Sequence, residues 1–191
     1  MTFYQEINLL PDSEVNLAFL WQKIYQQIHL ALVENKLPNG NSAIAISFPE
    51  YGDKTFPLGK KLRLHGQTES LLTQLEIEKW LTRFSDYAHI SSIKAAPSSA
   101  QHAVFRRKQY RTNVERLARR RAKRKNESFD EAMKHFSQFK DQKSDLPYID
   151  LRSLSKVTQF KLFIQRQIQA NPTEGDISCY GLSSSASVPL F

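Results

Sequence analysis

The sequence predicts a mixed α+β fold, and three observations lead to that prediction. Short runs that alternate apolar and polar residues, which are typical of strands, recur along the 191 residues. Between them lie longer stretches in which apolar residues recur at helical spacing. An apolar content of 40% is enough for a packed core, in one domain or in two small ones.

The first half of the chain alternates strands and helices in a recognisable order. We expect a strand at 3–10, a helix that opens at 11–14, strands at 42–48 and 60–66, a helix from about 68 to 84, and a strand at 88–95. The order βαββαβ is the ferredoxin-like arrangement, which RNA-recognition modules share. Many unrelated activities use this fold, so it favours RNA binding only weakly. The aromatic signature of those modules is also missing from the third strand.

The second half predicts another α+β region. A linker at 95–99 divides the chain into a first domain, 1–96, and a second domain, 97–191. The second domain is expected to hold a strand at 102–109, a basic helix, and a short helix opened by a capping box at Ser128–Glu131. Three strand-like runs follow at 147–153, 159–167 and 176–182, with a hairpin turn at 170–176 joining the last two.

The basic helix is the most informative segment. Arg106 to Lys125 holds eleven Lys or Arg and one acid. Five of these cations recur at i, i+3, i+4, i+7 and i+8 and therefore share one helix face: Arg116, Arg119, Arg120, Lys123 and Arg124. The ordinary alternative to a binding surface is a solvated helix face or a localisation signal. Solvated faces usually mix positive and negative side chains, and this one has almost no acids. The pattern favours a nucleic-acid partner and leaves RNA and DNA open.

Other classes of protein are disfavoured. Cys179 is the only cysteine, so no internal disulfide can form and a reducing cytoplasm is expected. No run of eighteen apolar residues, signal peptide, zinc spacing, P-loop or dinucleotide-binding glycine pattern is present. The sequence therefore predicts a protein that needs no cofactor and no metal.

Several separated segments resemble one known family. They are QQIHLAL at 26–32, SAIAISFP at 42–49, RRKQ at 106–109, NVERLARRRAKR at 113–124, LRSLS at 151–155, QFKLFI at 159–164 and SCYGLSSSASVPLF at 178–191. Together they resemble the CRISPR repeat-processing endoribonuclease of the type I-F system, from one end of the chain to the other. The resemblance implies an enzyme with a ferredoxin-like N-terminal domain that binds a stem-loop of precursor CRISPR RNA. It also implies metal-independent cleavage at the 3′ base of that hairpin, retention of the mature guide RNA, and partners among the surveillance-complex subunits, including the backbone subunit.

The resemblance assigns three catalytic residues. His29 corresponds to the family's general base, whereas from the helix alone it would be read as a histidine at the edge of the apolar face. Ser153 corresponds to the serine that holds the attacking 2′-hydroxyl, and Tyr180 to the tyrosine that orients the imidazole. Without the resemblance, these two residues are an ordinary turn serine and an ordinary core tyrosine.

The RNA contacts follow from the same comparison. Arg107 and Gln109 are the expected readers of guanine and adenine. Phe160 is expected to stack on the closing base pair, although a core position in a strand is a serious alternative. Ser155 is expected near the scissile bond. Arg119, Arg120, Lys123 and Arg124 are expected on phosphates, and Arg116 is also expected to bind RNA.

Two other functions compete with the nuclease. One is a non-catalytic cap subunit that binds the RNA hairpin in a CRISPR ribonucleoprotein, for which replacing His29 would change nothing. The other is a DNA-binding or ribosome-associated basic protein, which would bind duplex DNA and RNA hairpins with comparable affinity at one salt concentration.

Overall fold

The computed structural model describes residues 1–110, 114–137, 144–153 and 158–191. These residues form two compact units. The larger unit comprises Met1–Lys108 and Pro147–Phe191, and the smaller comprises Gln109–Leu146. Strands and helices are mixed and the neighbouring strands are antiparallel, so the prediction of an α+β protein is confirmed.

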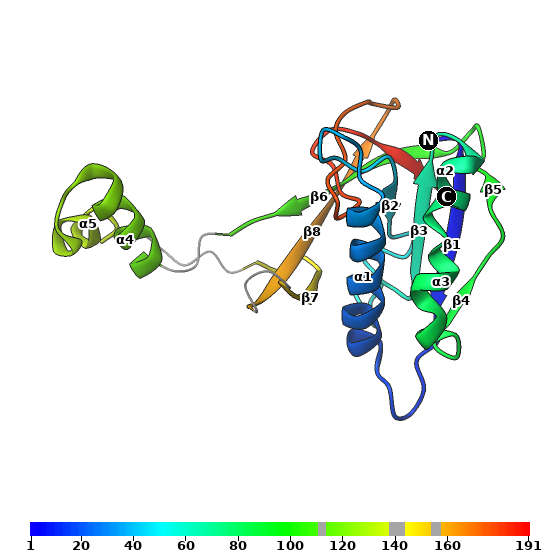
Figure 1. Ribbon diagram of the computed structural model, residues 1–191, viewed down its shortest axis with the longest axis horizontal. Coiled ribbons are helices and arrows are strands. Elements are labelled where there is room, and N and C mark those ends of the chain that lie inside the picture. The colour runs from blue at the N-terminus through cyan, green and yellow to red at the C-terminus, as the bar shows by residue number, and fades with distance from the viewer. Residues whose placement is uncertain (111–113, 138–143, 154–157) are drawn as a thin grey trace. The chain divides into compact units, whose positions relative to one another are not determined.

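The first sheet of the larger unit follows the predicted order of elements. Its strands are β1 (Phe3–Leu9), β2 (Ala45–Ser47), β3 (Lys61–Gly66) and β4 (Ala88–Ile90), arranged in the order β2-β3-β1-β4, with the short β5 (Lys94–Ala95) also paired to β1. Its helices are α1 (Leu17–Glu34), α2 (Glu69–Leu75) and α3 (Ile77–Leu81), followed by the 3-10 turn η1 (Thr82–Phe84). All three helices lie along this sheet, and α1 also packs against α3 (Figure 1).

Two of the predicted elements are interrupted. The single helix expected from 68 to 84 breaks at Glu76, whose φ of 49° is left-handed. The break allows Leu75 and Ile77, on either side of it, both to be buried. The strand expected at 88–95 is split because the Ser91 hydroxyl, rather than a backbone carbonyl, accepts from the backbone N–H of Glu6.

The second sheet has the order β7-β8-β6-β9. Its strands are β6 (Gln101–Lys108), β7 (Tyr148–Arg152), β8 (Gln159–Gln169) and β9 (Val188–Leu190). Both sheets belong to one compact unit, although β5 ends at Ala95 and β6 begins at Gln101. The division into domains 1–96 and 97–191 therefore stays a prediction.

The predicted hairpin over 170–182 is wrong. No strand forms at 176–182, where the chain makes a turn closed by a bridge between Ile177 and Ser183. The Ser183 hydroxyl donates to the carbonyl of Asp176 and accepts from the backbone N–H of Ala186. Serine hydroxyls thus satisfy backbone groups that a strand would pair in a ladder.

The described residues of the smaller unit form two helices, α4 (Val114–Lys125) and α5 (Phe129–His135). They pack through two fully buried alanines, Ala118 and Ala132. Both hydrogen bonds of the predicted capping box, between Ser128 and Glu131, are present at the start of α5.

None of the helices in the described part of the chain combines the length and the apolar character needed to cross a lipid bilayer.

Candidate active site

Helix α1 places His29 at the border between core and solvent. The helix begins after Asn16, whose side chain accepts a hydrogen bond from the backbone N–H of Phe19. Its apolar face, which includes Tyr25 and Ile28, is fully buried. His29 follows Ile28 directly and is half-buried at the edge of that face. The imidazole is therefore held by packing and still reaches the surface.

A tight turn late in the chain lies against His29. The turn is closed by a 2.8 Å hydrogen bond from the backbone N–H of Gly181 to the carbonyl of Ser178. Gly181 has a φ of +70°, and a Cβ at this position would lie 2.4 Å from Cγ1 of Ile46. The backbone N–H of Ile46 and the hydroxyl of Tyr25 donate to the carbonyls of Gly181 and Tyr180, at 2.8 and 2.7 Å. Glycine is therefore required for the turn to sit this close to β2 and α1.

The turn fixes the tautomer of His29. Nδ1 of the imidazole lies 2.8 Å from the backbone carbonyl oxygen of Cys179. A carbonyl oxygen can only accept, so Nδ1 carries the hydrogen and donates it. In the neutral imidazole the second nitrogen, Nε2, then has a free lone pair for accepting a proton.

The ring of Tyr180 stacks on the imidazole. The two ring centroids are 4.2 Å apart and the planes differ by 1°. The hydrogen bond to Cys179 alone would let the imidazole ring rotate about the bonds of its side chain. The stack with Tyr180 restrains this rotation. This contact matches the orienting role that the sequence predicts for Tyr180, and the role itself stays a prediction.

The surroundings of His29 favour its neutral form. Partial burial is the largest cause and lowers the pKa of His29 below its ordinary value of 6.5. The hydrogen bond to Cys179 opposes this shift, and the nearby cation of Arg107 adds to it. At neutral pH the imidazole is therefore uncharged and able to act as a base.

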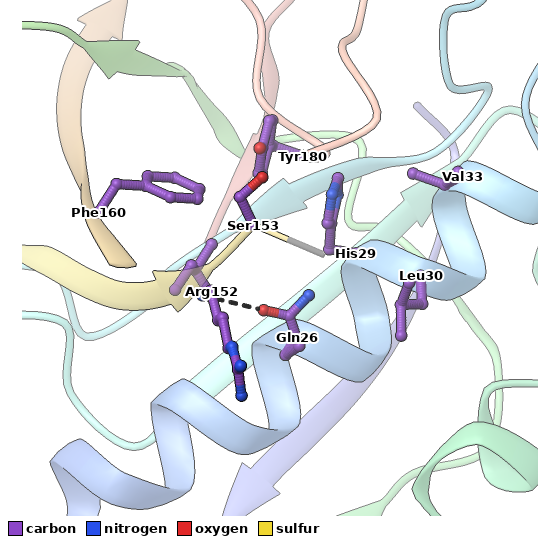
Figure 2. Close-up of a pocket in the computed structure, with 9 residues that line it drawn as sticks. Gln26, His29, Leu30, Val33, Arg152, Ser153, Phe160 and Tyr180 are labelled. Carbon is purple, nitrogen blue, oxygen red and sulfur yellow. Dashed lines mark hydrogen bonds between the residues drawn. The ribbon is translucent and has the colours of Figure 1, made fainter. Parts of the chain in front are cut away.

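Ser153 lines the same pocket as His29. The pocket is an open hollow formed by Gln26, His29, Leu30, Val33, Leu151, Arg152, Ser153, Phe160 and Tyr180. Ser153 follows the end of β7, and its backbone N–H donates to the carbonyl of Thr158 at 2.8 Å. Figure 2 shows the side chains of His29, Ser153 and Tyr180 around this hollow. The predicted contact Ser155 lies outside the described residues.

Phe160 and Arg107 complete this group. Phe160 is half-buried on β8, and its ring meets that of Tyr180 edge to face, with centroids 6.3 Å apart. Its strand neighbours Leu162 and Ile164, on the same face, are fully buried. Arg107 on β6 places its guanidinium 5.3 Å from the Phe160 ring and 5.1 Å from the Tyr180 ring. Phe160 therefore stands at the end of a strand face whose next two residues lie in the core, and it lines the pocket.

Sequence reasoning missed three parts of the site. Gln26 lies one helical turn before His29, and its side chain accepts from the backbone N–H of Arg152 at 3.3 Å, which ties α1 to β7 (Figure 2). The spacing of three residues on a helix could have indicated Gln26. Nothing in the sequence points to Arg152 or to the backbone carbonyl of Cys179.

The remaining predicted contacts lie in the smaller unit. Gln109 is exposed, and so are the five predicted cations of α4: Arg116, Arg119, Arg120, Lys123 and Arg124. Arg119 also pairs with Glu115 one turn earlier, with 3.3 Å between nitrogen and oxygen. The helix thus presents a dense positive surface with one acid beside it.

Within the described ranges, no three His, Cys, Asp or Glu side chains gather where they could hold a metal ion.

Comparison with known proteins is consistent with these features. A family model described as CRISPR-associated protein (Cas_Csy4) matches residues 4–191. Two curated relatives, from Escherichia coli (strain UTI89 / UPEC) and Pseudomonas aeruginosa (strain UCBPP-PA14), are each 33% identical over 192 residues. The alignment covers 100% of this chain and 100% of each relative, and both relatives are named CRISPR-associated endonuclease Cas6/Csy4. The family identified from the sequence and the expectation of an endonuclease are confirmed, and the chain belongs to the Cas_Csy4 family of CRISPR-associated proteins.

Proposed function

We propose that this protein is an endoribonuclease that binds the stem-loop of a CRISPR repeat and cuts at its 3′ base without a metal ion. The observation that carries the proposal is the hydrogen bond from His29 Nδ1 to the carbonyl of Cys179, in a pocket that Ser153 also lines. This bond leaves Nε2 as the base in a site open to solvent. The family and its named endonucleases support the choice of CRISPR RNA as substrate.

In the proposed reaction the RNA supplies its own nucleophile. Nε2 of His29 takes the proton of a 2′-hydroxyl, and the 2′-oxygen forms a bond to the adjacent phosphorus. The bond from phosphorus to the 5′-oxygen breaks, and that oxygen takes a proton from solvent while the protonated His29 returns its proton to solvent. The products are a 2′,3′-cyclic phosphate and a 5′-hydroxyl, so no water is consumed.

The other pocket residues position these atoms. Ser153 holds the 2′-hydroxyl by a hydrogen bond and so favours in-line attack. Tyr180 keeps the imidazole plane fixed through the stack at 4.2 Å. Phe160 offers the exposed part of its ring to the last base pair of the stem, a stacking contact worth about 1–3 kcal/mol.

Binding of the stem is assigned to the basic surface of α4. An A-form helix presents closely spaced phosphates, and arginine binds them with two parallel hydrogen bonds. Arg107 and Gln109 add base contacts to guanine and adenine, and each such pair contributes about 1–3 kcal/mol of discrimination. With this many contacts outside the scissile bond, the cut RNA stays bound, and the protein remains with its guide RNA and the other surveillance-complex subunits.

The strand order β2-β3-β1-β4, with α1 and α2–α3 along one sheet, supports a ferredoxin-like first domain.

A cleavage assay tests the proposal. Purified protein is mixed with repeat RNA in excess EDTA, and the ends of the products are identified by mass spectrometry. We expect cleavage at one position with a 2′,3′-cyclic phosphate. Uncut RNA that is bound tightly would identify a non-catalytic cap subunit, and a 3′-hydroxyl product would exclude attack by the 2′-oxygen.

A further inference from the structure

Arg107 is connected to the catalytic imidazole through one aromatic ring. Its guanidinium carbon lies 5.1 Å from the centroid of the Tyr180 ring, and that ring stacks on His29 at 4.2 Å. The second ring within reach of the guanidinium is Phe160, at 5.3 Å. Cation, tyrosine ring and imidazole thus form consecutive contacts. Figure 2 shows the last two of these groups, Tyr180 and His29, in the pocket.

The strand places Arg107 in this position. Ala103 and Phe105 on β6 are buried, and alternate residues of a strand share a face. Arg107 is next on that face, where the core ends, so its side chain is half-buried beside two aromatic rings. A partly desolvated cation over aromatic faces is held more firmly than one in water.

One donor of Arg107 has no partner among the described residues. In the described part of the chain its Nε is buried and meets no acceptor. The rings of Phe160 and Tyr180 stand at 86° to each other, so the planar guanidinium can stack face to face on only one of them. When its face lies on the Tyr180 ring, its edge keeps hydrogen-bond donors for another group. Arg107 does not itself line the pocket, where the cation is Arg152, from the end of β7.

We propose that Arg107 is a positioning residue that links recognition of the RNA to its cleavage. The face of its guanidinium holds the Tyr180 ring against the His29 imidazole, while its edge donates to a base of the RNA. This inference rests on the proposed function, because it gives Arg107 a part in the reaction that His29 performs. A residue that only reads a base would affect affinity, whereas Arg107 also affects the rate of the bound complex.

The test uses Arg107→Ala and Arg107→Lys, with Arg166→Ala as a matched control. Arg166 lies on β8 with its guanidinium carbon 4.8 Å from the centroid of the Tyr51 ring, whereas the rings near Arg107 are those of Tyr180 and Phe160. The first measurement is an NMR titration of the His29 imidazole in the protein without RNA. The second is the single-turnover cleavage rate with all RNA bound.

We expect Arg107→Ala to raise the pKa of His29, because the variant removes a nearby cation and lets water closer. Its rate with bound RNA should fall about 10–100-fold, as expected for a misplaced catalytic group. Arg107→Lys keeps a cation but loses the planar face, so it should titrate more like the wild type and still cut slowly. Arg166→Ala should match the wild type in both measurements.

Two results would overturn the inference. One is a His29 titration unchanged in Arg107→Ala, and the other is a full rate in Arg107→Lys once its RNA is bound. If Arg107→Ala does not fold, the lysine variant alone decides through its rate. A wild-type protein that fails to cut RNA would reject the proposed function instead, and the titrations would still report whether Arg107 acts on His29.

Discussion

The pocket around His29 and the basic helix α4 are built by opposite rules. In the pocket, one hydrogen bond of 2.8 Å and one ring stack at 4.2 Å hold a single neutral imidazole. On α4, exposed cations stand on a helix that packs through Ala118 against Ala132. Proton transfer depends on tenths of an ångström, whereas attraction to phosphates acts over several ångströms. Burial in this protein therefore serves to position a side chain, and exposure serves to present charge.

The largest expected effect comes from His29→Ala. Removing the base should slow cleavage about 10²–10⁴-fold, because that is the usual contribution of general base catalysis. Hairpin affinity should be little changed, since α4 and the two residues proposed to read bases remain. Single-turnover kinetics and a gel shift on the same preparation measure both quantities. The control is His89→Ala, at an exposed position on β4. If His29→Ala cleaves as fast as the wild type, His29 is not the base.

Gly181→Ala should break the pocket without touching a catalytic side chain. The left-handed φ and the 2.4 Å approach to Ile46 together should destabilise the protein by about 1–3 kcal/mol and displace the Cys179 carbonyl. Thermal melts and cleavage rates measure the two effects.

Gly52→Ala is the matched control for that substitution. Gly52 has a φ of +93°, but a Cβ there would meet nothing within 4 Å. The Gly52→Ala variant should lose only the stability that a left-handed φ costs an alanine, and it should cleave RNA at the full rate. Similar losses of activity in both variants would mean that the turn does not hold His29.

On the basic helix, Arg120→Ala should weaken hairpin binding. The loss of one phosphate contact should reduce the slope of log affinity against log salt by about one. The rate with all RNA bound should change far less than the affinity. Fluorescence titrations at several salt concentrations test this, and an unchanged affinity would argue against the RNA-binding surface on α4.

The pH dependence should separate the two regions. Because the pKa of His29 is lowered below 6.5, the cleavage rate should be flat near pH 7 and fall only at more acidic pH. Arginine stays charged throughout this range, so the contribution of α4 to binding should not change. A rate that still rises steeply above pH 7 would show that another group is the base.

Stability must be followed in the same experiment. Burial lowers the pKa of His65 to about 3. Between pH 6.5 and 3 the unfolded chain therefore binds more protons at this histidine than the folded protein does, and the free energy of unfolding falls as the solution is acidified. Melting curves at each pH identify the range in which rates can be compared.

The smallest expected effect is a gain. Glu115→Gln releases Arg119 from its exposed ion pair and should strengthen RNA binding by less than 1 kcal/mol, the usual range for surface pairs. Glu14→Gln removes the same charge at an exposed site in the larger unit. If both variants gain equally, the effect belongs to net charge and not to Arg119.

The basic helix could be predicted from sequence because its signals are local. Charge density and helical spacing lie within twenty residues, and α4 occupies the last twelve of them. The strand and helix order of the first sheet was predictable for the same reason. The break at Glu76 was not, because burying both Leu75 and Ile77 depends on the sheet beneath them.

The pocket was less accessible to sequence reasoning. His29 could be predicted as the catalytic base only through the family resemblance. Helical spacing alone indicates a histidine at the edge of a buried face. The hydrogen bond that fixes its tautomer comes from a backbone carbonyl, which every residue possesses. The turn carrying that carbonyl was expected to be a strand, because its apolar residues alternate and its serine hydrogen bonds have no periodic pattern.

The bond between His29 and Cys179 joins positions 150 residues apart. A nascent chain leaving the ribosome makes its histidine long before the partner oxygen is synthesised, and contacts this distant in sequence form late in folding. Until then either imidazole nitrogen can carry the proton, and the ring has no fixed orientation. If His29 is the base, as proposed, the enzyme should therefore be unable to cut until the far segment of the polypeptide has closed over the first helix.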